Sequence, residues 1–236
     1  MLLPAGFVAI AAGIVVWTDL ALGRATAACR DSSSVARGIR WRFRAGALIW
    51  IALVLVLAAS GVLGQWERRL PPFVLVVVSI AVLGVVIARS SIGDRLSRGL
   101  PLASLVGLQA FRLPLELLMH QTALAGVMPE QMTYSGRNFD IITGITAVLL
   151  AMWLRTGRPP RSLVAGWNVM GLLLLANIVT VAVLSTPQFA AFGSTPDRLN
   201  TFVTRAPYVL LPAVMVLAAW AGHLIVFRAL ARTLSE

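Results

Sequence analysis

Four stretches of 18 to 24 residues contain no Asp, Glu or Arg, and they constrain the fold more than any other feature of the chain. They cover residues 45–64, 71–88, 162–185 and 206–227. Each is long enough to cross a hydrocarbon layer of about 30 Å as a helix, for which roughly 20 residues suffice. Backbone polar groups inside a membrane must be bonded within the protein, which favours helices. We therefore expect an all-α integral membrane protein.

The composition indicates that membrane spans use up most of the chain. Hydrophobic residues make up 58% of the 236 residues and charged residues 12%, whereas an average soluble domain is roughly 25% charged. Little sequence remains for a separate extramembrane part, so we expect a single domain over residues 1–236. The alternation typical of outer-membrane barrels is not visible in the sequence. We therefore expect a multi-pass protein of the bacterial inner membrane.

Three further spans are predicted from weaker signals. Residues 2–22 form the first, and because a basic stretch follows this segment instead of preceding it, we expect a retained span and not a cleaved signal peptide. Residues 99–125 carry charged side chains. The uncharged part of residues 138–157 has only 14 residues, about 21 Å of helix, so that span must draw polar residues into the membrane at its N-terminal side.

The charges between spans alternate along the chain. Residues 24–44 hold six Arg and one Asp, residues 89–98 three Arg and one Asp, and residues 155–161 three Arg, whereas the intervening loops have a net charge of at most +1. The positive-inside rule places the arginine-rich segments in the cytoplasm. The sequence thus predicts seven transmembrane helices, with the N-terminus outside and the C-terminus inside. The predicted spans are residues 2–22, 45–64, 71–88, 99–125, 138–157, 162–185 and 206–228.

Several function classes are excluded or disfavoured. All 20 basic residues are arginine, so no lysine Schiff base can form. The net charge of +11 is accounted for by topology, and we expect no nucleic-acid partner. A single cysteine, Cys29, cannot form a disulfide within the chain. Nucleotide-binding loops and a serine-hydrolase elbow are absent from the sequence, so any energy source would be a gradient or a partner protein.

A polar stripe marks the fourth predicted span. Gln109, Arg112, Glu116 and His120 follow spacings of three, four and four residues, which places them on one face of a helix. Arg112 lies near the middle of the span and needs a partner there, for which Glu116 is the nearest candidate. Pro114 is expected to kink the helix beside Arg112. The stripe predicts either a ligand or ion site, with Glu116 and His120 suited to proton coupling, or a buried pair that only fixes helix packing.

A second polar segment leads into the fifth predicted span and contains Arg137, Asn138 and Asp140. These residues and the outer part of the fourth span share a depth. Arg137 could pair with Glu116, or Asp140 with Arg112. The alternative interpretation is a helix start at which Asp140 interacts favourably with the helix dipole.

The sixth and seventh predicted spans contribute fewer polar side chains. Asn177 is expected to face the Glu116 site, whereas Asn168 is expected to bond to another helix as a packing contact. His223 belongs to the inner half and is predicted to lie too far from His120 for both to bind one metal. No metal site is therefore assigned, although a set of His120, Glu116 and Asp140 stays open as an alternative, and no cofactor is identified. The candidate ligand-binding residues are Gln109, Arg112, Glu116, His120, Arg137, Asn138, Asp140 and Asn177.

Three segments carry a resemblance to a known group of proteins. They are FRLPLELLMH at 111–120, MTYSGRNFDIITG at 132–144 and GWNVMGLLLLANIV at 166–179. The chain resembles an uncharacterised bacterial family of multi-pass inner-membrane proteins. The resemblance covers roughly the fourth to seventh predicted spans. It implies a seven-helix membrane protein and assigns no catalytic roles.

These features favour a small transporter or permease-like protein. Its outward-opening polar pocket would bind a small polar or anionic molecule, with Arg112 or Arg137 as anion partner and a proton gradient as one source of energy. Two alternatives stay open: an intramembrane enzyme acting on a lipid or isoprenoid, and a non-catalytic sensor or assembly subunit. The expected partners are the lipid bilayer and a small polar molecule or lipid, with a second copy or another membrane protein left open.

Overall fold

The computed structural model describes residues 2–232, and these residues form helices and connecting loops with no strand. Six helical segments are long and apolar enough to cross a membrane, and α7 (Ile141–Thr156) is a shorter apolar helix. The predicted all-helical chain with several membrane-spanning candidates is thereby confirmed. The six segments are α1 (Leu2–Ala28), α2 (Ser33–Ala59), α3 (Pro72–Arg89), Leu102–Leu124, α8 (Arg161–Leu184) and Leu211–Arg232.

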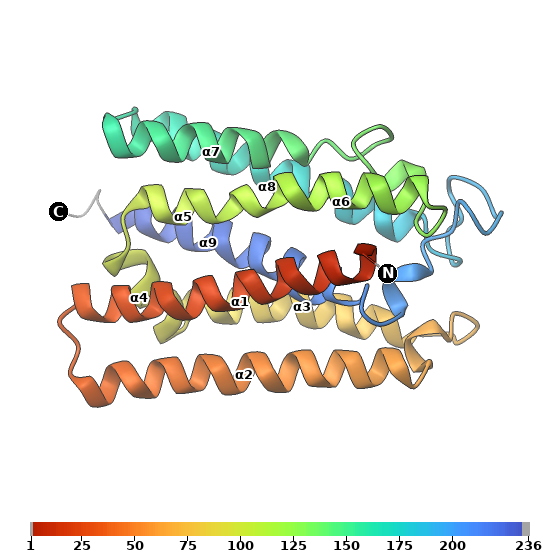
Figure 1. Ribbon diagram of the computed structural model, residues 1–236, viewed down its shortest axis with the longest axis horizontal. Coiled ribbons are helices and arrows are strands. Elements are labelled where there is room, and N and C mark those ends of the chain that lie inside the picture. Colours follow the sequence, from red (N-terminus) through yellow and green to blue (C-terminus); the bar gives the residue numbers. More distant parts are fainter. Residues whose placement is uncertain (1, 233–236) are drawn as a thin grey trace.

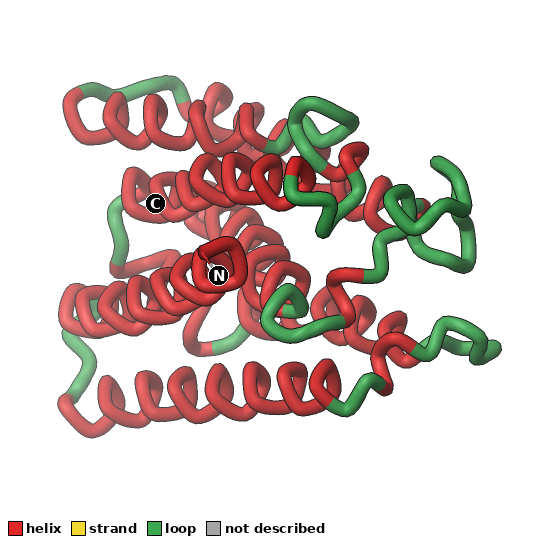
Figure 2. Tube along the Cα trace, turned by 45° about the vertical axis from the view of Figure 1, so that its right-hand side comes forward, coloured by secondary structure: helices red, strands yellow, loops and turns green. Residues whose placement is uncertain are grey.

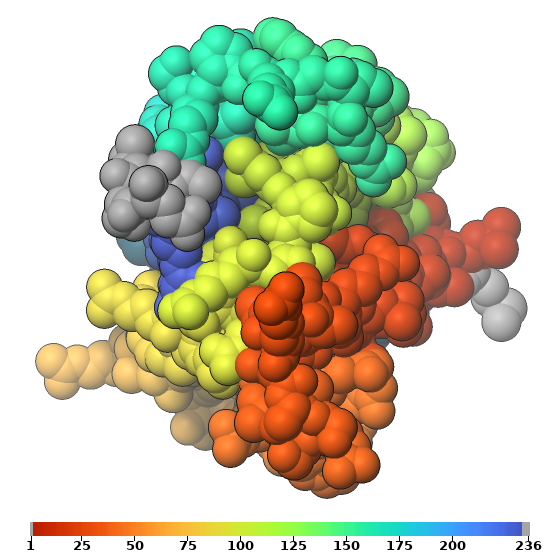
Figure 3. Space-filling view, turned by 90° about the vertical axis from the view of Figure 1, so that its left-hand side faces the viewer, coloured from red at the N-terminus to blue at the C-terminus, as the bar shows by residue number. Residues whose placement is uncertain are grey.

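The helices lie side by side along the long axis of the molecule (Figure 1). α2 lies at one edge of the bundle and α7 with α8 at the other, while α9 (Leu217–Arg232) runs between them. Longer loops gather at one end, opposite the short α1–α2 turn (Figure 2). The other end carries the turns between α1 and α2 and between α7 and α8, which Figure 3 shows from outside. The arginine-rich segments 24–44, 89–98 and 155–161 all lie at this second end.

The first two helices are longer than predicted. We expected a loop over the arginine-rich residues 24–44, whereas only a short turn separates α1 from α2, and Ser32 caps α2 by accepting the N–H of Val35 at 3.4 Å. Arginine is a good helix former, and its long side chain carries the charge away from the apolar layer, so a basic run need not end a helix.

Asp19 ties the two helices together. Its carboxylate accepts hydrogen bonds from Arg40 and Arg44, one turn apart on α2, at 2.6 and 2.7 Å. Because both arginines are committed to this aspartate, the α1–α2 hairpin has a fixed register at its arginine-rich end.

The fourth predicted span is broken in the middle, as the proline indicated. α5 (Leu102–Leu108) and α6 (Arg112–Leu124) are joined by a 3₁₀ turn, Gln109–Phe111. Pro114 has no N–H to offer the carbonyl of Ala110, so the helix cannot continue regularly across this point. The break brings Gln109 and Arg112 into the centre of the bundle, where both are buried.

Two other segments differ from the sequence-based expectation. The predicted loop at 89–98 contains a short helix, α4 (Ser91–Gly99). The last span begins with a π-helical turn, Leu211–Val216, in which the carbonyl of Ala213 accepts the indole N–H of Trp50 at 2.8 Å. A wider turn leaves such carbonyls available to neighbouring helices, which periodicity alone does not reveal.

Asp94 on α4 organises the arginine-rich end. Arg228 donates to it at 2.6 Å, and Arg232 of the same helix donates to it as well. Although burial raises the pKa of the Asp94 carboxyl, the hydrogen bond from Arg232 and the charges of Arg232, Arg98 and Arg228 hold it below its ordinary value. α4 is thereby fixed to the end of α9.

Candidate functional site

Arg112 lies at the centre of the bundle, with 1% of its surface exposed. Its Nη1 donates to Asp140 Oδ1 at 2.7 Å and to the carbonyl of Gly171 at 3.3 Å. The same Asp140 oxygen accepts the hydroxyl of Thr143 at 3.1 Å. Asp140 is therefore the ionic partner of Arg112, which confirms one of the two pairings suggested by the shared depth, and the expectation that Glu116 takes this role is wrong.

Glu116 is bound by an amide instead of a guanidinium. Asn138 Nδ2 lies 2.8 and 2.7 Å from its two carboxyl oxygens and 3.1 Å from the carbonyl of Met132. The Asn138 Oδ1 atom accepts the backbone N–H of Asp140 at 3.0 Å, which fixes the orientation of the amide. The segment before α7 thus supplies a partner for each charged group of α6.

Asp140 occupies the N-cap position of α7, but its side chain makes no capping bond. Its carboxylate binds Arg112 and Thr143 instead. Asp140 thus stands at the helix start, as the alternative interpretation expected, and also forms the ion pair with Arg112. The start of α7 is held by the Asn138 turn, and the acidic side chain of Asp140 is free to pair with a charge on another helix.

The polar cluster extends inward from Arg112. Gln109 donates to the carbonyl of Ala219 at 3.2 Å. His223 Nδ1 lies 2.6 Å from Asn168 Oδ1, and Asn168 Nδ2 donates to the carbonyl of His223 at 3.0 Å. The predicted helix-to-helix bond of Asn168 is confirmed, and its partner is His223, which the sequence did not indicate. They come from different helices, and spacing within one helix does not report such a contact.

Close helix approaches at two glycines hold this cluster together. A Cβ on Gly144 would lie 2.5 Å from the backbone nitrogen of Leu113, so α7 packs directly against the start of α6. A Cβ on Gly171 would lie 2.5 Å from the His223 ring and 3.1 Å from Thr143. Small residues on one face of an apolar helix are the signal that would have indicated these contacts from sequence.

Three of the predicted site residues lie outside the cluster. His120 bonds Ser135 at 3.2 Å and stacks against Tyr134, with ring centroids 4.6 Å apart, at the end of the bundle that carries the longer loops. Arg137 is exposed, and its guanidinium lies 5.1 Å from the Phe192 ring centroid, so the expected pair with Glu116 does not form. Arg137 lies just before the start of α7, and its side chain is exposed.

Asn177 is the third residue, and it does not reach Glu116. Its Nδ2 donates to the carbonyl of Arg137 at 2.7 Å. Asn177 thereby fixes the loop before α7 to α8, which is a positioning role for the segment that carries Asn138 and Asp140.

A cavity of about 670 Å³ opens beside Arg112, between α3 and α8. Its wall is mainly apolar, with Val77 and Ile80 of α3 facing Leu175 and Val179 of α8. Trp66, in the loop before α3, and Gln188, in the loop after α8, also line it. Its charged lining side chains, among residues 2–232, are Arg69, Arg112, Glu116 and Asp140.

Three buried side chains of the cluster keep polar atoms without a protein partner. They are Arg112 Nε and Nη2, Gln109 Oε1 and His223 Nε2. An unpaired buried polar atom costs about 1 to 3 kcal/mol, and more when it is charged. The unpartnered edge of the Arg112 guanidinium is therefore suited chemically to an oxyanion or to water, although both of its nitrogens are buried from the adjoining cavity.

A metal site is not supported by the arrangement of side chains. Within the described part of the chain, no three His, Cys, Asp or Glu side chains gather in a way that could hold a metal ion. The alternative set of His120, Glu116 and Asp140 fails because the His120 ring packs among Tyr134 and Ser135.

Comparison with known proteins identifies a family of unknown function. A family model described as a domain of unknown function (DUF8737) matches residues 71–231. No curated protein and no solved structure matches the chain. The match runs from the start of α3 into the last turn of α9 and includes every residue of the buried cluster. The resemblance to an uncharacterised family is thereby confirmed.

Proposed function

The chain belongs to the DUF8737 family, and we propose that it is a small permease-like transporter of the bacterial inner membrane. Its ligand is an anionic molecule with an apolar body, bound in the cavity beside Arg112. The observation that carries this proposal is a buried guanidinium with an unpartnered edge, on a side chain that lines a mainly apolar cavity of about 670 Å³.

Seven spans with the N-terminus outside are part of the proposal. α1 begins at the end with the longer loops and α9 ends at the arginine-rich end, as an odd number of crossings requires. α7 has 16 residues, about 24 Å of helix, and would complete its span with the segment that carries Asn138 and Asp140. The positive-inside rule then puts the arginine-rich end in the cytoplasm.

The chemistry of the cavity supports an anionic amphiphile as ligand. Arg112 binds Asp140 through Nη1 alone, so Nε and Nη2 can bind two oxygens of a carboxylate, sulfonate or phosphate. Burying an apolar body against the apolar wall of α3 and α8 contributes about 25 cal/mol of binding free energy per Å² of apolar surface. A small polar solute brings no such contribution.

Charge balance supports coupling to protons. With Asp140 and Glu116 both ionised, these two carboxylates and Arg112 sum to −1, which opposes the binding of an anion beside Arg112; the fourth charged lining residue among those described, Arg69, belongs to the loop before α3. A proton on Glu116 brings the sum to zero, and Asn138 can still donate to the neutral carboxyl. We propose that binding of the anion takes up one proton at Glu116. His120 is not part of this step, since it lies among the loop residues.

We propose that the cavity opens at the end that the proposed topology places outside. Arg112 begins α6, which runs away from the arginine-rich end, and the lining of the cavity extends from Arg112 to the loop residues Trp66 and Gln188, which would form its rim. A ligand entering from outside would then pass this rim before its anionic group reaches Arg112.

An intramembrane enzyme is the second candidate. The same apolar wall would suit a lipid or isoprenoid, and Glu116 could act as a base beside it. A purely structural role has less support, because packing residues with no other task would be fully bonded with no cavity, whereas Arg112, Gln109 and His223 are not.

Fluorescence titration of the protein in lipid nanodiscs tests the binding site. Anilinonaphthalene sulfonate is an apolar anion, and phenylnaphthylamine has the same rings without the sulfonate. We expect the protein to bind the sulfonate above the level of empty discs. Asp140→Asn should strengthen this binding about tenfold, because it frees the charge-assisted hydrogen bond of Arg112.

The controls separate the site from general attraction to a basic protein. The double variant Arg112→Gln/Asp140→Asn should lose sulfonate binding and keep that of phenylnaphthylamine, while Arg137→Gln, which removes an exposed arginine, should bind like the original protein. Equal sulfonate binding by the double variant would refute the assignment of Arg112. Loss of a lipid substrate with appearance of a product, followed by mass spectrometry, would favour the enzyme.

A further inference from the structure

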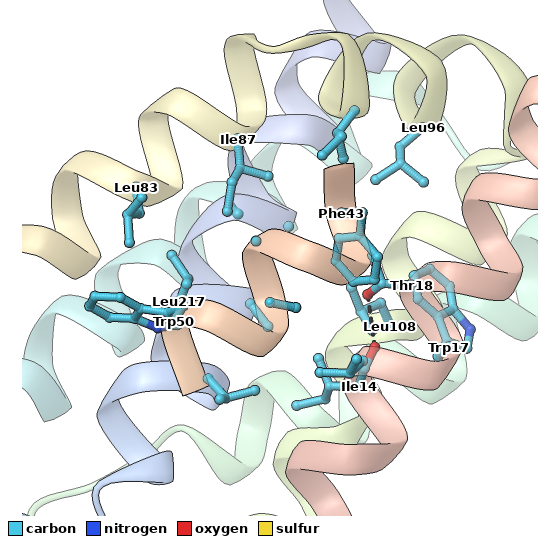
Figure 4. Close-up of a pocket in the computed structure, with 18 of the residues that line it drawn as sticks. Ile14, Trp17, Thr18, Phe43, Trp50, Leu83, Ile87, Leu96, Leu108 and Leu217 are labelled. Atoms are coloured by element: carbon cyan, nitrogen blue, oxygen red, sulfur yellow. Dashed lines mark hydrogen bonds between the residues drawn. The ribbon is translucent and has the colours of Figure 1, made fainter. Parts of the chain in front are cut away.

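A second cavity extends from the middle of the bundle toward the arginine-rich end, and among residues 2–232 it shares no lining residue with the cavity beside Arg112. It has a volume of about 250 Å³ and lies beneath α2, between α1, α3 and α9. Figure 4 shows Phe43 and Trp50 of α2, and Leu83 and Ile87 of α3, around it. The lining is apolar apart from a few groups, of which Arg42 is the charged one among the described residues.

α2 covers this cavity loosely. Its only buried residues are Ile39, Val54 and Ala58, so most of the helix faces the surroundings of the bundle. Gly46 lines the cavity, and a Cβ built on it would have no atom of a neighbouring element within 4 Å. The space under α2 is therefore not filled by side chains of the described protein.

Arg42 differs from its neighbours on the same helix. Arg40 and Arg44 are held by Asp19, whereas Arg42 has no bonded partner among the described residues and is exposed at the edge of the cavity. Trp41, beside it, is 70% exposed. An exposed tryptophan next to arginine is typical of the level at which lipid headgroups lie.

We propose that this cavity binds an acyl chain of an anionic phospholipid, with the lipid phosphate at Arg42. The apolar part of the site favours a hydrocarbon chain over a peptide, because a chain has no backbone polar groups to satisfy. The unpaired guanidinium at the mouth of the cavity complements a phosphate. The lipid would fill the space under α2 and fix this helix to α3 and α9.

Thermal unfolding of the delipidated protein in detergent tests the proposal. Palmitoyl-oleoyl phosphatidylglycerol and palmitoyl-oleoyl phosphatidylcholine share their chains and differ in net headgroup charge. We expect phosphatidylglycerol to raise the melting temperature more than phosphatidylcholine does, with saturation. Arg42→Gln should weaken the affinity for phosphatidylglycerol about fivefold, the effect of one arginine near an anionic lipid surface.

Two matched controls distinguish a site from diffuse attraction. Arg37→Gln removes an exposed charge from the same helix outside the cavity and should keep the full phosphatidylglycerol effect. Gly46→Leu should fill the cavity and abolish the effect, while Gly38→Leu, at an equally open glycine of α2 that does not line the cavity, should retain it. Equal stabilisation by the two lipids would overturn the proposal, and so would an equal loss of phosphatidylglycerol affinity in Arg37→Gln and Arg42→Gln. The comparison of these two arginine variants decides the question even if Gly46→Leu does not fold.

Discussion

Gln188 and Trp66 are joined at the rim of the large cavity: Gln188 Nε2 donates to the carbonyl of Trp66 at 2.8 Å. Gln188 follows α8 and Trp66 precedes α3, so the bond links the two walls of the cavity where it meets the outside in the proposed topology. It is exposed and lies between two loops, which makes it one of the easiest contacts of the site to open.

Breaking this bond should speed entry into the cavity. We expect Gln188→Ala to raise the association rate of anilinonaphthalene sulfonate severalfold in stopped-flow measurements, because the two loops then separate without losing a hydrogen bond. Gln121→Ala, at an exposed glutamine of α6, is the matched control and should leave the rate unchanged. An unchanged rate in Gln188→Ala would mean that ligands enter by another route.

Arg112 and Asp140 should depend on each other for stability. Arg112→Gln leaves the buried Asp140 carboxylate without its ion pair, and Asp140→Asn leaves the guanidinium without its counter-charge, each at a cost of about 3 to 5 kcal/mol. The double variant should recover part of this loss. The measurement is the free energy of unfolding in detergent. If the losses in the double variant were additive, the two residues would not depend on each other for stability.

Asp94 should make the arginine-rich end sensitive to acid. In the folded protein the pKa of Asp94 lies below its ordinary value of 3.8. Burial raises this pKa, but the hydrogen bond from Arg232 and the charges of nearby arginines lower it by more. The stabilisation is therefore present at neutral pH and is lost as the pH falls below about 4 toward the folded pKa.

Asp94→Asn tests this dependence. We expect it to cost about 2 kcal/mol at neutral pH and progressively less in acid, as measured by unfolding at several pH values. Glu130→Gln removes an exposed carboxylate and should change little at any pH. A loss in Asp94→Asn that stays constant down to low pH would show that the carboxylate charge is not what holds α4 to α9.

The proposed topology can be checked with reporter fusions. Fusions ending at Val35 and Pro160 lie within arginine-rich segments and should report the cytoplasm, whereas one ending at Phe192 should report the outside. A periplasmic signal at Val35 would show that the topology is inverted, with the rim at Trp66 and Gln188 facing the cytoplasm.

The apolar spans could be predicted from the sequence because hydropathy is a local property. Residues 71–88 and 162–185 agree with α3 and α8 to within a residue at either end. The ends of α1 and α2 could not be predicted in this way. Arginine-rich residues were interpreted as loop, yet they continue both helices, since arginine combines high helix propensity with a side chain that reaches polar surroundings.

The candidate site was predictable along one helix and only in part between helices. Spacing identified Gln109, Arg112 and Glu116, which are all buried near Pro114. A shared depth suggested the pair of Asp140 with Arg112, whereas the bond of Asn138 to Glu116 depends on where α7 packs, and Gly144 sets that position by its close contact with Leu113. His120 follows the same spacing but lies near the end of α6, where the loop at Tyr134 and Ser135 covers it.

Glu116 should be the group that couples ligand binding to protons. It is the carboxyl group of the cavity that has no ionic partner, since Asn138 binds it and Asp140 pairs with Arg112. Glu116→Gln keeps the size of the side chain and fixes its charge at zero, so anilinonaphthalene sulfonate should bind with an affinity that no longer changes with pH. Isothermal titration calorimetry in buffers of different ionisation enthalpy should show uptake of one proton per sulfonate in the original protein and none in Glu116→Gln. His120→Gln should keep the proton uptake, because its ring lies among loop residues. The opposite result, with uptake lost in His120→Gln and kept in Glu116→Gln, would move proton coupling out of the Arg112 cavity and separate it from anion binding.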